Sequence, residues 1–403
     1  MSERVKKIVF ISGFITISIG IAIALYLVFF RTPAQTDEEI ITGEDLVTGL
    51  PTAEEGTPST ISPEEPEELV ASEVARGGLT AVTSLTTGRI SSTSINPDGS
   101  SMNYYDPSDD RFYRINEDGT ATQLSDQKFP DVDSVAWANQ GDKAVIEFPD
   151  GSNVVYNFET EVQVTLPNHW EDFDFSPSGS EIITKSLGVD PNNRWLVITS
   201  DDGTRTQGIA ALGNNEDEVQ VNWSPNDQVI AFSDTGPAQT GFGRKMILPI
   251  GKNEENYKGL IVEGFGFEAL WSPRGDRVLY SVASHGDDYK PSLWLVDGSG
   301  EDMGDDRRNL GIETWVDKCT FSSASSILCA VPQGLPNNSG IQRALADGTF
   351  DYVYEIDINS GVSSLLAIPD ENVSMESLTL SDDGSTLYFT DADSGILQMI
   401  KLQ

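Results

Sequence analysis

The chain has 403 residues, and its 25 Lys and Arg residues against 64 Asp and Glu residues give a formal net charge of −39. Such an excess of negative charge repels the phosphates of nucleic acids, so it argues against a DNA- or RNA-binding protein. Two cysteines and two histidines are too few for a disulfide-stapled small fold, a four-thiolate zinc site or a histidine-rich metal centre.

Residues 8–30 form an uncharged stretch rich in Ile, Leu, Val and Phe. As a helix, a stretch of this length crosses a hydrocarbon core of about 30 Å. Three basic residues precede it, and after Arg31 the next basic residue is Arg76. The positive-inside rule then predicts a single-pass signal anchor in the cell membrane, with residues 1–7 in the cytoplasm and the bulk outside it, periplasmic or on the cell surface. A cleaved secretory signal is the alternative, although its apolar region would be unusually long.

Residues 31–77 are rich in Thr, Pro, Ser and acidic residues and contain few aromatic ones. Such a composition buries too little apolar surface to offset chain entropy, and its like charges repel one another. We therefore expect a disordered acidic stalk. A short helix is expected at its end, from Pro66 to Arg76, because Gly77 and Gly78 would stop it.

A short pattern recurs along the rest of the chain: a hydrophobic or aromatic residue, a turn of Pro, Asp or Gly type, and an apolar strand. Seven copies lie at residues 95–99, 137–141, 175–179, 223–227, 271–275, 321–325 and 380–384. Each copy predicts a β-hairpin, and most are followed by a loop and a second pair of strands. Because a lone four-stranded blade leaves its faces uncovered, radial stacking is expected. The fold class predicted for residues 78–403 is all-β, a single β-propeller of about seven four-stranded blades.

The two most complete turns are Trp-Ser-Pro-Asn-Asp at residues 223–227 and Trp-Ser-Pro-Arg-Gly at residues 271–275. They resemble the PD40 (WD40-like) repeats of TolB-like and prolyl-oligopeptidase-type propellers. The resemblance implies the fold and says little about function, because many unrelated activities use this architecture. Proline is missing at Gln140 and in residues 323–325, which leaves blade counts of six, seven and eight open.

The last repeat has room for only three strands, and the apolar segment 79–86 precedes the first hairpin. We expect this segment to supply the missing outer strand and close the ring, which would remove an unpaired edge.

The two cysteines, Cys319 and Cys329, flank the turn of the sixth hairpin and should face each other on adjacent strands. At that spacing a disulfide is geometrically possible and would suit an oxidising compartment. Two buried free thiols remain the alternative.

The connections between the second and third strands are longer in repeats three to six, at residues 187–194, 235–244, 283–291 and 332–351. By analogy with other propellers they should share one face and form an asymmetric rim for recognition. The alternative is that polar loops merely vary in length. The candidate binding residues on this rim are Arg194, Phe242, Arg244, Lys245, His285, Tyr289, Lys290, Arg343 and Phe350. Their basic members make an acidic or carboxylate-bearing partner conceivable.

No G-x-S-x-G nucleophile elbow and no Walker-type phosphate loop occurs in the sequence. His285 with Asp287 and Asp288 is more commonly a solvated loop than a metal site. We therefore expect no catalytic residues, no metal and no cofactor. The predicted function is a membrane-anchored binding or scaffolding module for a protein or envelope-polymer partner. The alternative is an extracytoplasmic hydrolase or lyase at the central channel or the rim, which would need carboxylates of raised pKa there.

Overall fold

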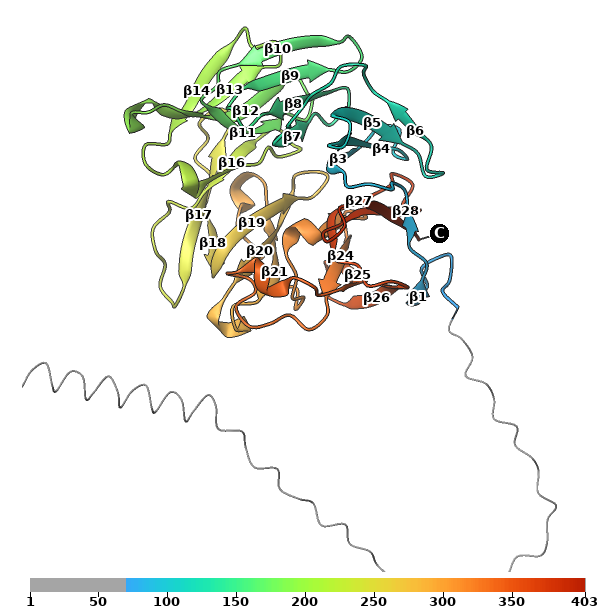
Figure 1. Ribbon diagram of the computed structural model, residues 1–403. Coiled ribbons are helices and arrows are strands. Elements are labelled where there is room, and N and C mark those ends of the chain that lie inside the picture. The colour runs from blue at the N-terminus through green and yellow to red at the C-terminus, as the bar shows by residue number, and fades with distance from the viewer. Residues whose placement is uncertain (1–69, 403) are drawn as a thin grey trace, which may run out of the picture. The chain divides into compact units, whose positions relative to one another are not determined.

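The computed structural model describes residues 70–402, which form seven β-sheets arranged in chain order around a ring (Figure 1). The predicted membrane segment 8–30 and residues 31–69 of the predicted stalk lie outside the described residues. Among residues 70–402, no helix is both long enough and apolar enough to span a bilayer. The sheet count answers the question that the degenerate repeats left open: the protein is an all-β propeller of seven blades.

The first five blades are antiparallel sheets whose strands follow the chain from the centre of the ring outwards. The first three blades are β3 (Ser91–Ile95), β4 (Met102–Asp106), β5 (Arg111–Ile115) and β6 (Ala121–Gln123); β7 (Ser134–Trp137), β8 (Lys143–Glu147), β9 (Asn153–Asn157) and β10 (Val162–Leu166); and β11 (Trp170–Phe175), β12 (Glu181–Leu187), β13 (Arg194–Ser200) and β14 (Thr206–Ala211).

The next two blades have the same order and carry longer connections. They are β15 (Val219–Val221), β16 (Val229–Ser233), β17 (Arg244–Gly251) and β18 (Leu260–Glu263); and β19 (Phe265–Trp271), β20 (Arg277–Ala283), β21 (Pro291–Asp297) and β22 (Arg308–Asn309). Six short 3-10 helices lie in the connections of the described chain: η1 (Pro191–Asn193), η2 (Glu216–Glu218), η3 (His285–Asp287), η4 (Gly300–Asp302), η5 (Val316–Lys318) and η6 (Arg343–Ala346).

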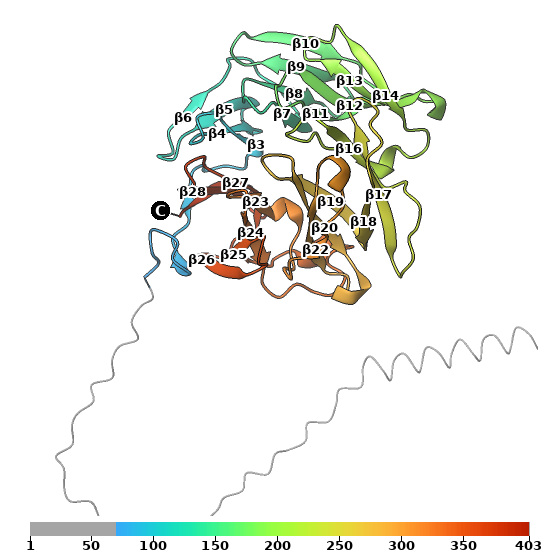
Figure 2. The ribbon, with the colours of Figure 1, turned by 180° about the vertical axis from the view of Figure 1, so that it is seen from behind.

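The last two blades join the two ends of the described chain. The sixth contains β23 (Cys319–Phe321), β24 (Ser326–Pro332), β25 (Asp351–Asp357) and β26 (Ser363–Pro369), and the seventh contains β27 (Met375–Leu380), β28 (Thr386–Asp391) and β29 (Leu397–Lys401). β2 (Thr83–Ser84) pairs antiparallel with β29 and is the fourth strand of the seventh blade. β1 (Gly78–Thr80) pairs parallel with β26 as a fifth strand of the sixth blade, and both views show it there (Figure 1, Figure 2).

Residues 70–76 form no helix, contrary to the helix predicted up to Arg76. Ser72 instead forms a parallel β-bridge with Thr80, and the Ala75 N–H donates to the Lys401 carbonyl at 2.8 Å. Pairing with a sheet edge satisfies these backbone groups, so tertiary contacts override the local helix preference.

The core is divided among the seven interfaces between neighbouring blades. Seven buried clusters each draw their side chains from two adjacent blades, and the cluster that closes the ring contains Tyr388 of β28 and Tyr104 of β4. The clusters of the other interfaces repeat this arrangement around the ring. Since no blade has a core of its own, the stacking that the repeats predicted is what buries the apolar faces.

The hairpin turns between the first and second strands of the blades hold neighbours together on one face of the ring, here called the turn face. Asn226 Nδ2 of the fourth blade donates to the Gly275 carbonyl of the fifth at 2.8 Å. Gly275 has φ +66°, and a Cβ there would lie 2.8 Å from Asn226, so glycine is required by both conformation and space. The backbone N–H of Asp382 in the seventh blade donates to the Gly99 carbonyl of the first at 2.9 Å.

Candidate functional site

The four long connections lie at the opposite ends of the strands from the hairpin turns, since each joins the second strand of a blade to the third. Residues 188–193, 234–243, 284–290 and 333–350 are here called the loop rim. The longest loop packs on its neighbour, because the N–H groups of Asn338 and Gly340 donate to the carbonyls of Asp288 and Tyr289, each at 2.9 Å.

The predicted cations of this region all have carboxylate partners. Arg244 Nε donates to Glu263 at 2.8 Å, and Lys290 contacts Glu313 at 3.0 Å. The remaining pairs are Arg194 with Glu216, Lys245 with Asp234, and Arg343 with both Asp317 and Glu376. The rim loops themselves carry five Asp residues against one Lys and one Arg. The positive charge on which an acidic partner would depend is therefore neutralised within the molecule.

A cleft of about 310 Å³ lies between the fourth and fifth blades at the loop rim. Two Gly-Phe-Gly segments frame it, residues 241–243 and 264–266. Arg244 pairs in register with Glu263 across β17 and β18, and the Gly264 N–H donates to the Gly243 carbonyl at 3.0 Å. This pairing sets the two segments side by side at the ends of their strands.

All four glycines of the two segments have positive φ, from +66° at Gly243 and Gly266 to +139° at Gly264. A residue with a side chain would be strained in these conformations. The chain therefore turns sharply on both sides of each phenylalanine, and Phe242 is left 75 % exposed and Phe265 53 % exposed. Two large apolar side chains exposed to water at the same cleft are typical of a binding surface.

His285 forms one wall of the cleft. Its ring lies 5.7 Å from the Phe242 ring on one side and 5.7 Å from the Tyr289 ring on the other, measured between centroids. Ser284 also lines the cleft, with its hydroxyl bound to Asp287 at 2.8 Å. The site thus offers aromatic faces, one imidazole and one Arg–Glu pair.

The structure therefore brings together three of the predicted residues, Phe242, Arg244 and His285, with Tyr289 in contact. The other predicted residues lie elsewhere: Phe350 packs its ring against Tyr352, while Arg194, Lys245, Lys290 and Arg343 are held by the ion pairs described above.

Sequence reasoning missed Phe265 and three further exposed apolar residues of the loop rim. Val189 is 99 % exposed, Ile341 56 % and Leu345 41 %. The repeated Gly-Phe-Gly was the available signal for Phe265, because a phenylalanine between two glycines at a strand end has no local partner to bury it.

Arg343 is the one basic residue of the sixth-blade loop, residues 333–350. Its guanidinium lies 4.8 Å from the ring of Trp315 and pairs with Asp317 at 2.7 Å and with Glu376 of β27 at 3.2 Å. Glu268 on β19 is exposed, yet the protein atoms around it exclude part of its water and raise its pKa; the charge of Asp317 adds to the rise and Arg343 opposes it. The two ion pairs connect the sixth-blade loop to η5 and to the innermost strand of the seventh blade.

A second carboxylate of raised pKa lies at the end of β8. Burial raises the pKa of Glu147, a hydrogen bond from Ser134 opposes the rise, and the charges of Asp172, Asp133 and Glu171 add to it. Among residues 70–402, no group of three or more His, Cys, Asp or Glu side chains is arranged to hold a metal ion.

Comparison with known proteins gives the fold alone. No protein-family model and no curated protein matches the chain. The β-propeller domain of Cps50 (Swd1) from Myceliophteria thermophila is similar over 80 % of this chain and 100 % of that one, with a TM-score of 0.53 and 9 % identity.

An oligogalacturonate lyase from Vibrio parahaemolyticus is similar over 80 % of this chain and 93 % of that one, with a TM-score of 0.54 and 11 % identity. The tricorn protease matches 82 % of this chain and 34 % of its own length, at 10 % identity and a TM-score of 0.49. At such identities the first two likenesses concern the fold alone and carry no activity with them.

Proposed function

We propose that the protein is a membrane-anchored, extracytoplasmic β-propeller that binds a protein or envelope-polymer partner through the loop rim. The observation that carries the proposal is the pair of exposed phenylalanines, Phe242 and Phe265, each framed by glycines and separated by a cleft. Aromatic side chains in such positions contribute most of the binding energy of many interfaces.

The chemistry of the rim favours a partner with an apolar anchor and basic neighbours. The two phenylalanine faces accept apolar or aromatic groups and attract cations. Five Asp residues against two basic residues in the rim loops attract positive charge. The partner expected from the rim loops is therefore positively charged, whereas the basic residues alone had suggested an acidic partner.

Two features support the location. The Cys319–Cys329 disulfide joins β23 to β24 and is stable in an oxidising compartment outside the cytoplasm. The uncharged segment 8–30, with its basic residues on the amino-terminal side, supports anchoring in the membrane with the propeller outside.

The test is crosslinking of the anchored protein in its native membrane, followed by affinity measurements on the partner it captures. Phe242→Ser with Phe265→Ser removes both exposed rings. Because a binding hot spot contributes about 2 kcal/mol or more, loss of a single ring should lower affinity about 30-fold, and we expect the double variant to lose at least that much.

The matched control is Val162→Ser with Val362→Ser, which removes two apolar side chains that are 55 % and 65 % exposed on the outer strand β10 and in the turn before β26. It should leave the captured partner unchanged. Recovery of the same partner with equal affinity by the phenylalanine variant would overturn the proposal.

The alternative function, a hydrolase or lyase, is favoured by two carboxylates of raised pKa, Glu268 on β19 and Glu147 on β8, since a general acid requires a raised pKa. The measurement is turnover of envelope polysaccharides by the wild type and by Glu268→Gln. Turnover that is lost in this variant, and kept in Phe242→Ser with Phe265→Ser, would favour the enzyme over the binding module.

A further inference from the structure

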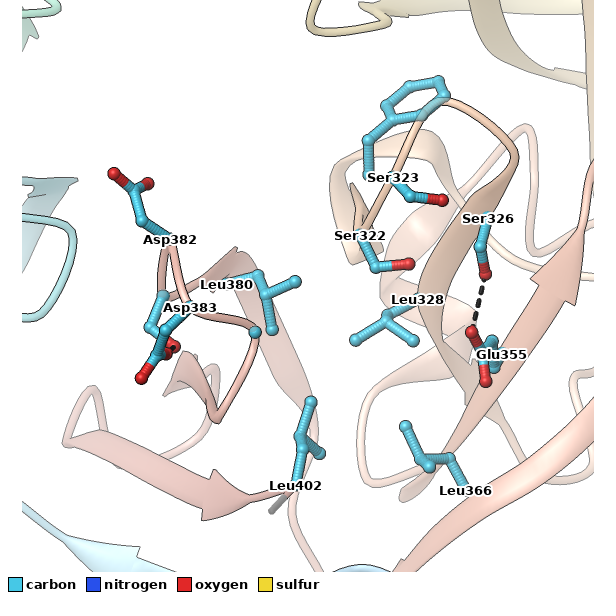
Figure 3. Close-up of a pocket in the computed structure, with 13 residues that line it drawn as sticks. Ser322, Ser323, Ser326, Leu328, Glu355, Leu366, Leu380, Asp382, Asp383 and Leu402 are labelled. Atoms are coloured by element: carbon cyan, nitrogen blue, oxygen red, sulfur yellow. Dashed lines mark hydrogen bonds between the residues drawn. The ribbon is translucent and has the colours of Figure 1, made fainter.

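Two clefts on the turn face differ in the charges that line them. The larger, of about 590 Å³, lies between the sixth- and seventh-blade turns, and its charged lining residues are all acidic: Glu355, Asp382 and Asp383 (Figure 3). The other, of about 380 Å³, lies between the first and second blades, and charges of both signs line it. It is on the opposite face of the ring from the loop rim, so a ligand bound in it would be independent of the proposed function.

Arg114 of β5 supplies the positive charge of this second cleft. The register of β4 with β5 places it opposite Asn103, whose Oδ1 accepts from Arg114 Nε at 3.3 Å. Arg114 Nη2 donates to Asn96 Oδ1 at 2.8 Å. Within residues 70–402 this guanidinium forms no ion pair, unlike the candidate cations of the loop rim. It has more N–H donors than these two amide oxygens use, so donors remain for a ligand.

Two buried amides hold the arginine in place. Asn96 and Asn103 are 2 % and 0 % exposed, and Asn96 Nδ2 donates to Asn103 Oδ1 at 2.8 Å. Asn103 Nδ2 donates to the Gly141 carbonyl of the second blade at 3.1 Å. Gly141 has φ +62°, and a Cβ there would lie 2.7 Å from Asn96 Oδ1, so glycine is needed for the second-blade turn to close over the amides. The guanidinium is thus oriented by a packed, buried network that joins the two blades.

The second-blade side of the cleft carries the opposite charge. Asp142 lies in the turn between β7 and β8 with its side chain 23 % exposed, and the exposed Glu159 lies between β9 and β10. Lys143 is 3.7 Å from Asp142 but donates to Asp201 at 2.7 Å. On the first-blade side, the Asp98 carboxylate already accepts hydrogen bonds from its own turn. Asp142 and Glu159 are therefore the carboxylates available to a ligand.

Apolar side chains complete the lining. Leu124 and Phe158 belong to the same buried cluster, in which Phe158 is buried and Leu124 partly exposed, and Pro97 adds its ring. The exposed part of this surface would be covered by an apolar group of a ligand. The volume of the cleft lies within the range of about 300 to 1,000 Å³ that is usual for small-molecule sites.

We propose that this cleft binds a free α-amino acid with an apolar side chain, its carboxylate on Arg114 and its ammonium group at Asp142 and Glu159. The planar guanidinium matches the two oxygens of a carboxylate, and an ammonium group, which has donors and no acceptor, matches carboxylate oxygens. A ligand with only one of these charges would satisfy one blade and leave the other unpaired. The amino acid would bridge the first and second blades.

The test is isothermal titration of the full-length protein with L-leucine at about 0.15 M salt, where the long-range field of the acidic protein is largely screened. We expect saturable binding of one leucine per chain. Leucinamide lacks the carboxylate and N-acetyl-leucine lacks the ammonium group, so each should bind at least about tenfold more weakly. L-Alanine keeps both charges and loses most of the apolar side chain, and its affinity should be at least about fourfold lower.

Variants test each charge against the ligand that lacks its partner. Arg114→Gln should abolish the preference for leucine over leucinamide. Asp142→Asn with Glu159→Gln should weaken leucine binding at least about tenfold and remove the preference over N-acetyl-leucine. The matched control is Glu301→Gln with Asp302→Asn, which neutralises two exposed carboxylates between the third and fourth strands of the fifth blade, on the same face. Its affinity for leucine should equal that of the wild type.

The proposal fails if leucine shows no saturable binding, or if leucine, leucinamide and N-acetyl-leucine bind equally. It also fails if the Asp142 and Glu159 double variant binds leucine as the control does, a result that does not depend on how well Arg114→Gln folds. Phe242→Ser with Phe265→Ser should not change leucine affinity, so failure here and failure of the loop-rim proposal are separable.

Discussion

The fourth and sixth blades are held to their next neighbours by different chemistry. In the fourth blade, the hairpin turn itself contacts the fifth blade, because Asn226 Nδ2 donates to the Gly275 carbonyl at 2.8 Å. In the sixth blade, the turn has no Pro or Gly and borders an open cleft towards the seventh. The sixth blade has instead a disulfide within its hairpin and a buried ion pair at its other end.

The buried ion pair connects three segments at the loop-rim end of the sixth and seventh blades. Lys318 of η5 contacts Asp351 at the start of β25 at 2.7 Å, and neither side chain is more than 4 % exposed. Asp351 also accepts the Met375 N–H of β27 at 2.6 Å. The Asp351 carboxylate thus fixes the end of the longest rim loop. The difference between the fourth and sixth blades indicates that a turn without Pro or Gly is tolerated where contacts at the other end of the blade hold it to its neighbour.

The largest expected effect comes from Lys318→Met, which leaves Asp351 buried without its cation. Burial already raises the pKa of Asp351, and Lys318 is the main influence that opposes the rise. We expect the free energy of unfolding to fall by about 3 to 5 kcal/mol at neutral pH, measured by urea denaturation.

Lys258→Met is the control, because the Lys258–Asp305 pair is about half exposed and should contribute less than about 1 kcal/mol. If both lysine variants lost the same free energy of unfolding, burial would not strengthen the Lys318–Asp351 pair. The sixth blade would then not depend on this pair for its attachment to the seventh.

The next effect is that of the disulfide. Cys319 pairs in register with Cys329, as the position of the turn predicted, and the bond closes a loop with a sequence separation of 10. Removing this cross-link with Cys319→Ala and Cys329→Ala should lower the free energy of unfolding by about 2 to 3 kcal/mol in the chain-entropy model.

Thiol reduction provides the control for that variant. A reducing agent should lower the stability of the wild type by a similar amount and leave the alanine variant unchanged. If reduction left the urea midpoint of the wild type unaltered, the hairpin would not depend on its cross-link, and the sixth blade would be held by the ion pair and its core alone.

Much of the fold could be predicted because the hairpin signal is local. A turn such as residues 223–227 and its flanking strands occupy adjacent positions in the sequence, and seven such units bury their faces only by stacking. The parallel pairing of β1 with β26 could not be predicted in this way, since Gly78 and Ala367 are far apart in the chain and the segment is only three residues long.

The candidate site was predicted less well, because strand register decides which charged residues form ion pairs. The sequence gives no partner for Arg244, and only the pairing of β17 with β18 places Glu263 opposite it. Apolar patterning alone does not distinguish Phe265 from its buried neighbours. Its exposure follows from the positive φ of Gly264 and Gly266, which turn the chain on both sides of it.

A second interface carboxylate provides the opposite case to Asp351. Asp174 of β11 lies between the third and fourth blades, where its two oxygens accept the N–H groups of Trp223 and Phe175 at 2.7 and 2.8 Å. Burial raises its pKa from 3.8 to about 6, although these hydrogen bonds oppose the rise. Where Asp351 has a lysine beside it, Asp174 is stabilised by backbone dipoles alone.

The smallest expected effect is therefore a pH dependence. The folded protein binds a proton at Asp174 more tightly than the unfolded chain does, so this residue favours the fold in acid and loses that contribution as the pH rises through the window from 3.8 to about 6. Asp174→Asn cannot titrate, so the stability of the wild type relative to this variant should fall by about 2 kcal/mol between about pH 4.5 and about pH 7. The variant also loses an acceptor for one N–H group, which shifts its stability equally at both pH values. Urea unfolding at the two pH values measures the difference in stability between the wild type and the variant. If this difference were the same at both pH values, the two backbone hydrogen bonds would stabilise the Asp174 carboxylate as effectively as Lys318 stabilises that of Asp351.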